Sequence, residues 1–162
     1  MIVRPAEEAD IAPLVAHWNR IIRDTTITFT TLEKTAGSLR ALIAERRAAG
    51  REFFVARDGD AVGFASYDQF RSGPGYAHAM EHTILLAPEL RGKGAGRALM
   101  SRLEDHARAG GAHTLFAGVS GENEAGIAFH RRIGFDASFR YPEAGRKFGR
   151  WLDLVLMMKR LG

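Results

Sequence analysis

Apolar residues recur along the chain with two different spacings, a helical repeat in some segments and alternation or short runs in others. The helical repeat predicts a first helix that Asp10 can cap and that ends near Arg23. It also predicts helices over residues 35–49, from about 95 to the Gly110–Gly111 pair, and over 123–133. The other segments predict strands over residues 2–4, 52–57, 61–67, 80–87, 114–119, 135–141 and 151–158.

The order of these elements predicts the class of fold. One strand is followed by two helices, three strands, a helix, a strand, a helix and two strands, whereas a doubly wound fold alternates more strictly. We therefore expect a mixed α/β sheet covered by helices. Neither an internal repeat nor a Pro/Ser-rich linker divides the chain, so residues 1–162 are expected to form a single domain.

Composition narrows the function classes without choosing one. The chain lacks cysteine, which excludes a disulfide framework, a thiolate metal site and a cysteine-bound acyl intermediate. The histidines show no metal-ligand spacing, so no metal is expected. No run approaches the roughly 18 apolar residues of a membrane span, and no signal-peptide pattern opens the chain, which predicts a cytoplasmic protein without a membrane partner. The net charge of +4 suits an anionic cofactor, nucleic acid or simple solubility.

The most informative segment is the glycine-rich turn LRGKGAGR, residues 90–97, between an apolar strand and an amphipathic helix. Its glycines let the backbone approach a ligand closely, and the first amides of the next helix have no acceptor within that helix. The helix dipole and the side chains of Arg91, Lys93 and Arg97 add attraction for phosphate. The spacing matches neither the dinucleotide-binding pattern nor a P-loop. The turn therefore predicts an anion site, with tight packing alone as the alternative.

Two motifs resemble the GNAT family of N-acetyltransferases. The pyrophosphate turn of that family reads Arg/Gln-x-x-Gly-x-Gly/Ala, which residues 91–96 match, and Asn123 and Gly134-Phe135 match the helix that follows. The resemblance implies a mostly antiparallel mixed sheet, flanked by about four helices, with a V-shaped split between two parallel strands. It also implies acetyl-CoA as co-substrate and direct attack of an amine on the thioester. The cofactor-binding residues that it implies are Ile84, Leu85, Leu86, Arg91, Gly92, Lys93, Gly94, Ala95, Gly96, Arg97 and Asn123.

A narrower resemblance, to the phosphinothricin and methionine sulfoximine acetyltransferase branch, covers most of the chain. The stretch GRKFGRWLD, residues 145–153, is its most specific match. Ala79, Leu85 and Gly126 depart from the branch; these departures leave the cofactor assignment unchanged and bear on the identity of the substrate. The branch implies a small amino acid or analogue as acceptor, and a homodimer. Trp151 is expected either to pack within the chain or to contact the partner in that dimer. Further matches are Thr28-Phe29, Phe70-Arg71, Tyr76-Ala77-His78, Glu81-His82-Thr83 and Phe129-His130.

Amine acetylation requires a base, because the attacking nitrogen must lose a proton. Glu81 is the predicted general base, since it lies on the strand that faces the implied cleft; the alternative is that it pairs with a basic neighbour. His130 is the predicted acid for the leaving thiolate, and a histidine that packs or caps is the alternative. Period two along the strand places Glu81, Thr83 and Leu85 on one face and His82, Ile84 and Leu86 on the other.

The acceptor site is expected to lie beside these residues. Arg71 offers a fork that matches the carboxylate of an amino acid, with a solvated loop arginine as the alternative. Phe29 either lines the acceptor pocket or fills the core. The substrate-binding residues predicted are Phe29, Arg71, Tyr76, His82 and Thr83.

Other functions stay open at this point. A protein N-terminal acetyltransferase or a polyamine acetyltransferase uses the same cofactor turn, and so does an acyl-CoA-sensing module without activity. A nucleic-acid partner is not expected, because the basic residues form short, separated groups and not a continuous stripe with exposed aromatic residues.

Overall fold

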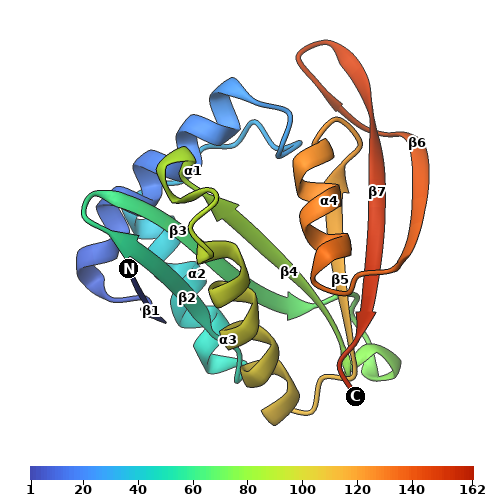
Figure 1. Cartoon of the computed structure of the whole chain (residues 1–162), viewed down its shortest axis with the longest axis horizontal. Coiled ribbons are helices and arrows are strands. Elements are labelled where there is room, and N and C mark those ends of the chain that lie inside the picture. The colour runs from blue at the N-terminus through green and yellow to red at the C-terminus, as the bar shows by residue number, and fades with distance from the viewer.

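The computed structural model describes residues 1–162 and contains one seven-stranded sheet with helices on both faces (Figure 1). The strand order is β1-β2-β3-β4-β5-β7-β6, and every adjacent pair is antiparallel except β4 and β5. The predicted mixed, mostly antiparallel sheet is therefore confirmed. The strands are β1 (Ile2–Pro5), β2 (Phe53–Asp58), β3 (Ala61–Gln69), β4 (Ala79–Leu86), β5 (Thr114–Ser120), β6 (Ala137–Lys147) and β7 (Arg150–Arg160); the α-helices are α1 (Ile11–Asp24), α2 (Ala36–Ala48), α3 (Ala95–Ala109) and α4 (Glu124–Arg132).

The two parallel strands, β4 and β5, separate halfway along their length. β4 pairs with β5 only from Ala79 to His82, opposite residues 114–117. Beyond His82, β4 continues to pair with β3 alone, while β5 continues to pair with β7 as far as Ser120. Figure 1 shows the resulting opening between β4 on one side and β5 with α4 on the other. The V-shaped split that the family resemblance implies is thus present.

Each face of the sheet carries its own hydrophobic core. Strand alternation sends Phe53 into the core beneath α1 and α2, and its neighbour Phe54 into the core beneath α3. In the same way, Leu85 of β4 belongs to the core beneath α1 and α2, while Ile84 packs against the core beneath α3. The alternation predicted for this strand is confirmed. None of the helices combines the length and the apolar character needed to cross a membrane.

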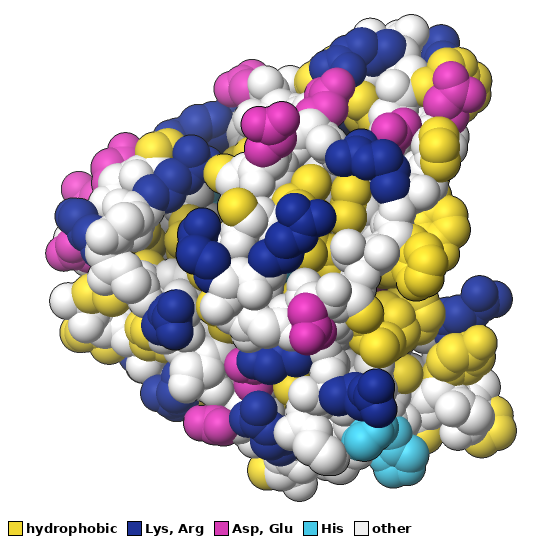
Figure 2. Space-filling view, turned by 45° about the vertical axis from the view of Figure 1, so that its right-hand side comes forward, with side chains coloured by type: hydrophobic (Ala, Val, Ile, Leu, Met, Phe, Trp, Pro, Cys, Tyr) yellow, Lys and Arg dark blue, Asp and Glu magenta, His cyan; other side chains and the backbone are white.

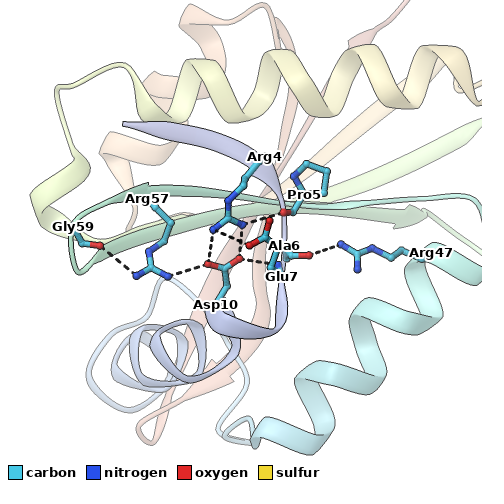
Figure 3. Close-up of polar contacts among 8 residues, drawn as sticks. All are labelled: Arg4, Pro5, Ala6, Glu7, Asp10, Arg47, Arg57 and Gly59. Atoms are coloured by element: carbon cyan, nitrogen blue, oxygen red, sulfur yellow. Dashed lines mark hydrogen bonds and ion pairs between the residues drawn. The ribbon is translucent and has the colours of Figure 1, made fainter.

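Asp10 does not cap α1 as predicted. Its main chain already has helical angles, and its fully buried carboxylate accepts hydrogen bonds from Arg4 at 2.7 Å and Arg57 at 2.9 Å (Figure 3). It also accepts the main-chain amide of Glu7 at 2.8 Å. Burial opposes the charge, but the bonds from Arg4, Glu7 and Arg57 lower the pKa of Asp10 overall. The aspartate therefore ties β1 and β2 to the start of α1.

The C-terminal hairpin is longer than predicted. The sequence pattern predicts a strand that ends at Tyr141, yet β6 runs to Lys147 and includes Pro142, which lacks an amide donor. A register shift between Tyr141 and Gly145 accommodates the proline, and the amide of Glu143 donates to the side chain of Asp153. A two-residue turn, Phe148-Gly149, with φ values of 53° and 73°, then leads into β7.

Candidate functional site

A groove of about 510 Å³ runs from the split to the N-terminal end of α3. Every residue that the family resemblance assigns to the cofactor lines it, with the exception of Lys93. The Lys93 ammonium instead lies 3.4 Å from the carboxylate of Asp58, where it forms an exposed ion pair. Arg91 and Arg97 are exposed and form no ion pair within the chain. Their charges are therefore free to attract an anion at this end of the groove.

The glycine-rich turn has the geometry of an anion site. Gly92 and Gly94 have φ values of 74° and 81°, a region that glycine adopts without strain. Gly94 occupies the N-cap position of α3 and has no side chain to cap the helix. The first main-chain bond of the helix runs from the Ala98 amide to the Gly94 carbonyl, so the amides of residues 95–97 lack partners within the helix. These features fit the diphosphate of a nucleotide-containing cofactor.

A second, smaller cavity of about 220 Å³ lies within the split itself. Its walls include residues from both faces of β4, namely Thr83 and Leu85 from one and His82 and Ile84 from the other. The two spaces adjoin, because five residues line both of them: Ile27, Ile84, Leu85, Asn123 and His130. Of the predicted substrate-binding residues, Phe29, His82 and Thr83 line this cavity.

Glu81 lies next to the point where the two strands separate. Its carboxylate faces Gly118 of β5, where an added Cβ atom would lie 3.1 Å from Glu81 Oε2. The residue keeps contact with solvent, but the atoms around its carboxyl group partly desolvate it and raise the pKa of Glu81. Glu81 forms neither an ion pair nor a hydrogen bond, so the structure does not contain the basic partner of the alternative interpretation. An unpaired carboxylate at this position can accept a proton.

His130 and His82 form a buried pair. Their Nε2 atoms lie 2.9 Å apart, and His130 Nδ1 lies 2.7 Å from the carbonyl oxygen of Gly126. Because a carbonyl only accepts, His130 Nδ1 carries the hydrogen, and in the neutral pair His82 Nε2–H donates to His130. Burial and the neighbouring His130 lower the pKa of His82 well below its ordinary value, and burial also lowers the pKa of His130. Both ring nitrogens of His130 are therefore engaged, and burial disfavours the charged form of the ring.

Arg71 and Tyr76 lie outside both cavities. They belong to the connection between β3 and β4, at the end of β4 opposite the split, and both are exposed. The Arg71 guanidinium lies 5.7 Å from the ring centre of Tyr76, and Gln69 holds the loop by donating to the carbonyl groups of Arg71 and Gly73. Arg71 has no carboxylate partner in the chain.

Several residues that line the smaller cavity were not predicted from the sequence. The segment between α1 and α2 contributes Ile27 and Thr28, and the far side of the split contributes Ser120 and Leu154. No motif places an irregular segment near residue 28 beside strands more than ninety residues later. The only signal was that Thr28-Phe29 and GRKFGRWLD belong to the same narrow resemblance, and the buried Lys147 does join these two stretches.

Comparison with known proteins identifies the family. Residues 18–135 match the family model described as "Acetyltransferase (GNAT) family". The chain belongs to this family of acetyltransferases. The split, the glycine-rich turn at α3 and the groove between them are thus the parts of a GNAT fold.

The GNAT relatives include enzymes that act on amino acids. The chain is 36% identical to the L-amino acid N-acyltransferase MnaT of Escherichia coli, over 99% of this chain and 94% of the relative. It is 35% identical to an L-methionine sulfoximine/L-methionine sulfone acetyltransferase of Pseudomonas aeruginosa, over 98% and 94%. A phosphinothricin acetyltransferase of Sinorhizobium meliloti, solved in complex with acetyl-CoA, superposes with a TM-score of 0.92 at 31% identity, over 99% and 88%.

Proposed function

We propose that this GNAT acetyltransferase transfers an acetyl group from acetyl-CoA to the amino group of a small amino acid or amino-acid analogue. The observation that carries the proposal is the unpaired carboxylate of Glu81 at the point where β4 and β5 separate, beside the split from which the anion-binding groove runs to α3. The names of the relatives support an amino-acid acceptor, with methionine sulfoximine and phosphinothricin as the first candidates. The cytoplasmic location stays a prediction.

The groove gives each part of acetyl-CoA a matching surface. The free amides at the start of α3, with Arg91 and Arg97, bind the diphosphate. The edge of β4 from Ile84 to Leu86 has lost its strand partner, so its main-chain groups are available to the amides of the pantetheine arm. This arrangement brings the thioester into the split. Bound acetyl-CoA supplies an activated acetyl carbonyl there.

Glu81 takes the proton that the attacking amine must lose, directly or through a water molecule. The amine nitrogen then bonds to the acetyl carbon, the carbon–sulfur bond breaks, and the sulfur leaves as a thiolate. A thiol has an ordinary pKa of about 8.5, so its thiolate is a tolerable leaving group without a dedicated acid. The acid role of His130 stays a prediction; its two engaged nitrogens and its lowered pKa favour the alternative that it packs and positions.

The cofactor assignment predicts a charge-specific effect at Gly94. Asn and Asp both tolerate the left-handed backbone of this residue, and an added Cβ meets no atom within 4 Å. Acetyl-CoA at 100 times its dissociation constant should stabilise the wild type by about 2.7 kcal/mol in thermal unfolding. Gly94→Asp should remove most of this gain by repelling the diphosphate, while Gly94→Asn should keep more of it. Equal stabilisation of all three proteins would contradict a diphosphate at this turn.

The base assignment predicts how the rate depends on pH. Only the carboxylate form of Glu81 accepts a proton, and its raised pKa means that this form is lost at a higher pH than for an ordinary glutamate. The wild-type kcat/KM should therefore fall as the pH is lowered through that pKa. Glu81→Gln should lower the neutral-pH rate about 10²-fold and remove this acid limb, with acetyl-CoA affinity retained. Glu81→Asp should keep the limb; an unchanged profile in Glu81→Gln would assign the limb elsewhere.

The acceptor class is tested by comparing carboxylate-bearing amines with their decarboxylated counterparts. Release of thiol from acetyl-CoA is measured with methionine sulfoximine, phosphinothricin, natural amino acids, polyamines and peptide N-termini. Arg71→Ala should cost about 1.5–3 kcal/mol in kcat/KM with carboxylate acceptors, the range of charged hydrogen bonds, and little with the matching amines. Equal losses for both kinds of acceptor, or a wild-type preference for polyamines or peptides, would replace the amino-acid assignment.

We further propose that the enzyme is a homodimer joined through the β6–β7 hairpin. β6 is an open sheet edge, and the two strands and their turn expose the aromatic side chains of Phe139, Tyr141, Phe148 and Trp151. Hydrophobic side chains also gather along the right-hand edge of the face in Figure 2, among lysine and arginine side chains. Light scattering should give twice the chain mass for the wild type and the single mass for Trp151→Lys. The matched control, Leu32→Lys, removes an exposed apolar residue of the α1–α2 connection and should stay dimeric.

A further inference from the structure

Lys147 is a buried cation that the proposed chemistry does not use. It is only 2% exposed and forms no ion pair with a carboxylate. Its ammonium group donates to the carbonyl oxygens of Thr25 and Thr28, at 2.7 Å each, and lies 3.4 Å from the Thr28 hydroxyl. Burial lowers the pKa of Lys147, which reflects the cost of holding the charge there. A buried ammonium without an acid partner needs these oxygens, and all of them belong to one short segment.

The same face of β6 supports that segment at a second point. Two residues before Lys147, and therefore on the same side of the strand, Gly145 lies directly against the ring of Phe29. A Cβ atom at residue 145 would overlap this ring, so the ring can pack this closely against β6 only because residue 145 is glycine. The register shift before Gly145 and the tight turn after Lys147 fix the orientation of this part of the hairpin.

A third contact holds the segment from the side. The hydroxyl of Thr26 donates to Glu122 at 2.7 Å, and the guanidinium of Arg150 bonds both oxygens of the same carboxylate. Arg150 is the direct cross-strand partner of Lys147. Both basic residues next to the hairpin turn thus contact residues 25–29. Lys147 bonds their carbonyl groups directly, and Arg150 contacts them through the exposed side chain of Glu122.

Residues 25–29 form one wall of the smaller cavity. They have no helix or strand of their own, and Ile27, Thr28 and Phe29 line the space together with Thr83 of β4 and Gly118 of β5. Figure 1 shows this part of the connection after α1 reaching across the open end of the split towards α4 and the C-terminal hairpin. Without contacts from the hairpin, the conformational entropy of such a segment would favour many arrangements.

We propose that Lys147 is a positioning residue that fixes residues 25–29 as the acceptor-side wall, so that the C-terminal hairpin determines which amine side chains fit. The inference rests on the proposed amino-acid acetylation and assigns its selectivity to contacts far from Glu81. It requires that Lys147 act on the wall and not on the cofactor. The cofactor groove and the wall share Ile27 but otherwise use different residues of the N-terminal half.

The test replaces Lys147 by Met, which keeps the length of the side chain and removes its donors. We expect the KM for the acceptor to rise roughly tenfold or more and the preference among acceptors of different side-chain size to fall, because the wall loses two charged hydrogen bonds. The dissociation constant for acetyl-CoA should change less than about twofold, since Ile27 is the one residue of the segment 25–29 that lines the cofactor groove. Amide hydrogen exchange of residues 25–29 should become faster. Wild-type acceptor selectivity in this variant, or wild-type hydrogen exchange, would overturn the proposal.

Two further variants keep the test decisive. Arg47→Met removes a cation that donates to the main-chain carbonyl of Ala6 at 2.7 Å (Figure 3). Arg47 lines neither cavity, so this variant should leave selectivity unchanged. Gly145→Ala should displace Phe29 while Lys147 remains, and should also change acceptor preference. If Lys147→Met does not fold, unchanged preference in Gly145→Ala overturns the proposal. A wild type that acetylates no amino acid contradicts the proposed function, whereas unchanged hydrogen exchange in Lys147→Met contradicts the role of Lys147.

Discussion

The site depends on one interruption of strand pairing, after His82 and Ala117. A main-chain amide or carbonyl that is withdrawn from water needs a hydrogen-bond partner, and each strand of an intact sheet provides those partners for its neighbour. Where β4 and β5 separate, the facing edge of β4 has no strand to pair with, and an extended ligand of peptide-like chemistry satisfies it. The two cavities and Glu81 all lie at this interruption.

Contacts from distant parts of the chain define the two sides of the opening. On one side, the buried pair of His82 and His130 joins β4 to α4 close to the last paired residues. On the other, Lys147 and Gly145 hold the segment after α1 against the cavity. The walls of the split are therefore fixed by contacts within the chain. They come from the first thirty residues, from the central strands with α4, and from the C-terminal hairpin. This distribution explains why a change at the hairpin is expected to reach the acceptor.

The sequence predicted the parts of the structure that depend on local spacing. Period two on β4, the helical repeats and the glycine turn before α3 each rest on near neighbours, and the structure contains them. Asp10 was misassigned because two arginines, at residues 4 and 57, compete for a carboxylate that local spacing assigns to a helix cap. The extension of β6 was missed because a bulge, which depends on the pairing with β7, accommodates Pro142. The His82–His130 and Lys147 contacts span 48 and 119 residues, and no single-sequence pattern specifies such pairs.

Charge is divided along the site in a way that suits acyl transfer. Cations gather where the diphosphate is proposed to bind, at Arg91 and Arg97, whereas the histidines near the reaction centre are held neutral by burial. The Lys147 ammonium is engaged by carbonyl groups. An amine that enters this region leaves water for a weakly polar space, which favours its neutral form, and that form alone attacks a thioester. The partly desolvated Glu81 holds its proton more strongly than an exposed glutamate would, for the same physical reason. Desolvation thus acts on both partners of the proposed proton transfer and brings the pKa values of the amine and the carboxyl group closer together.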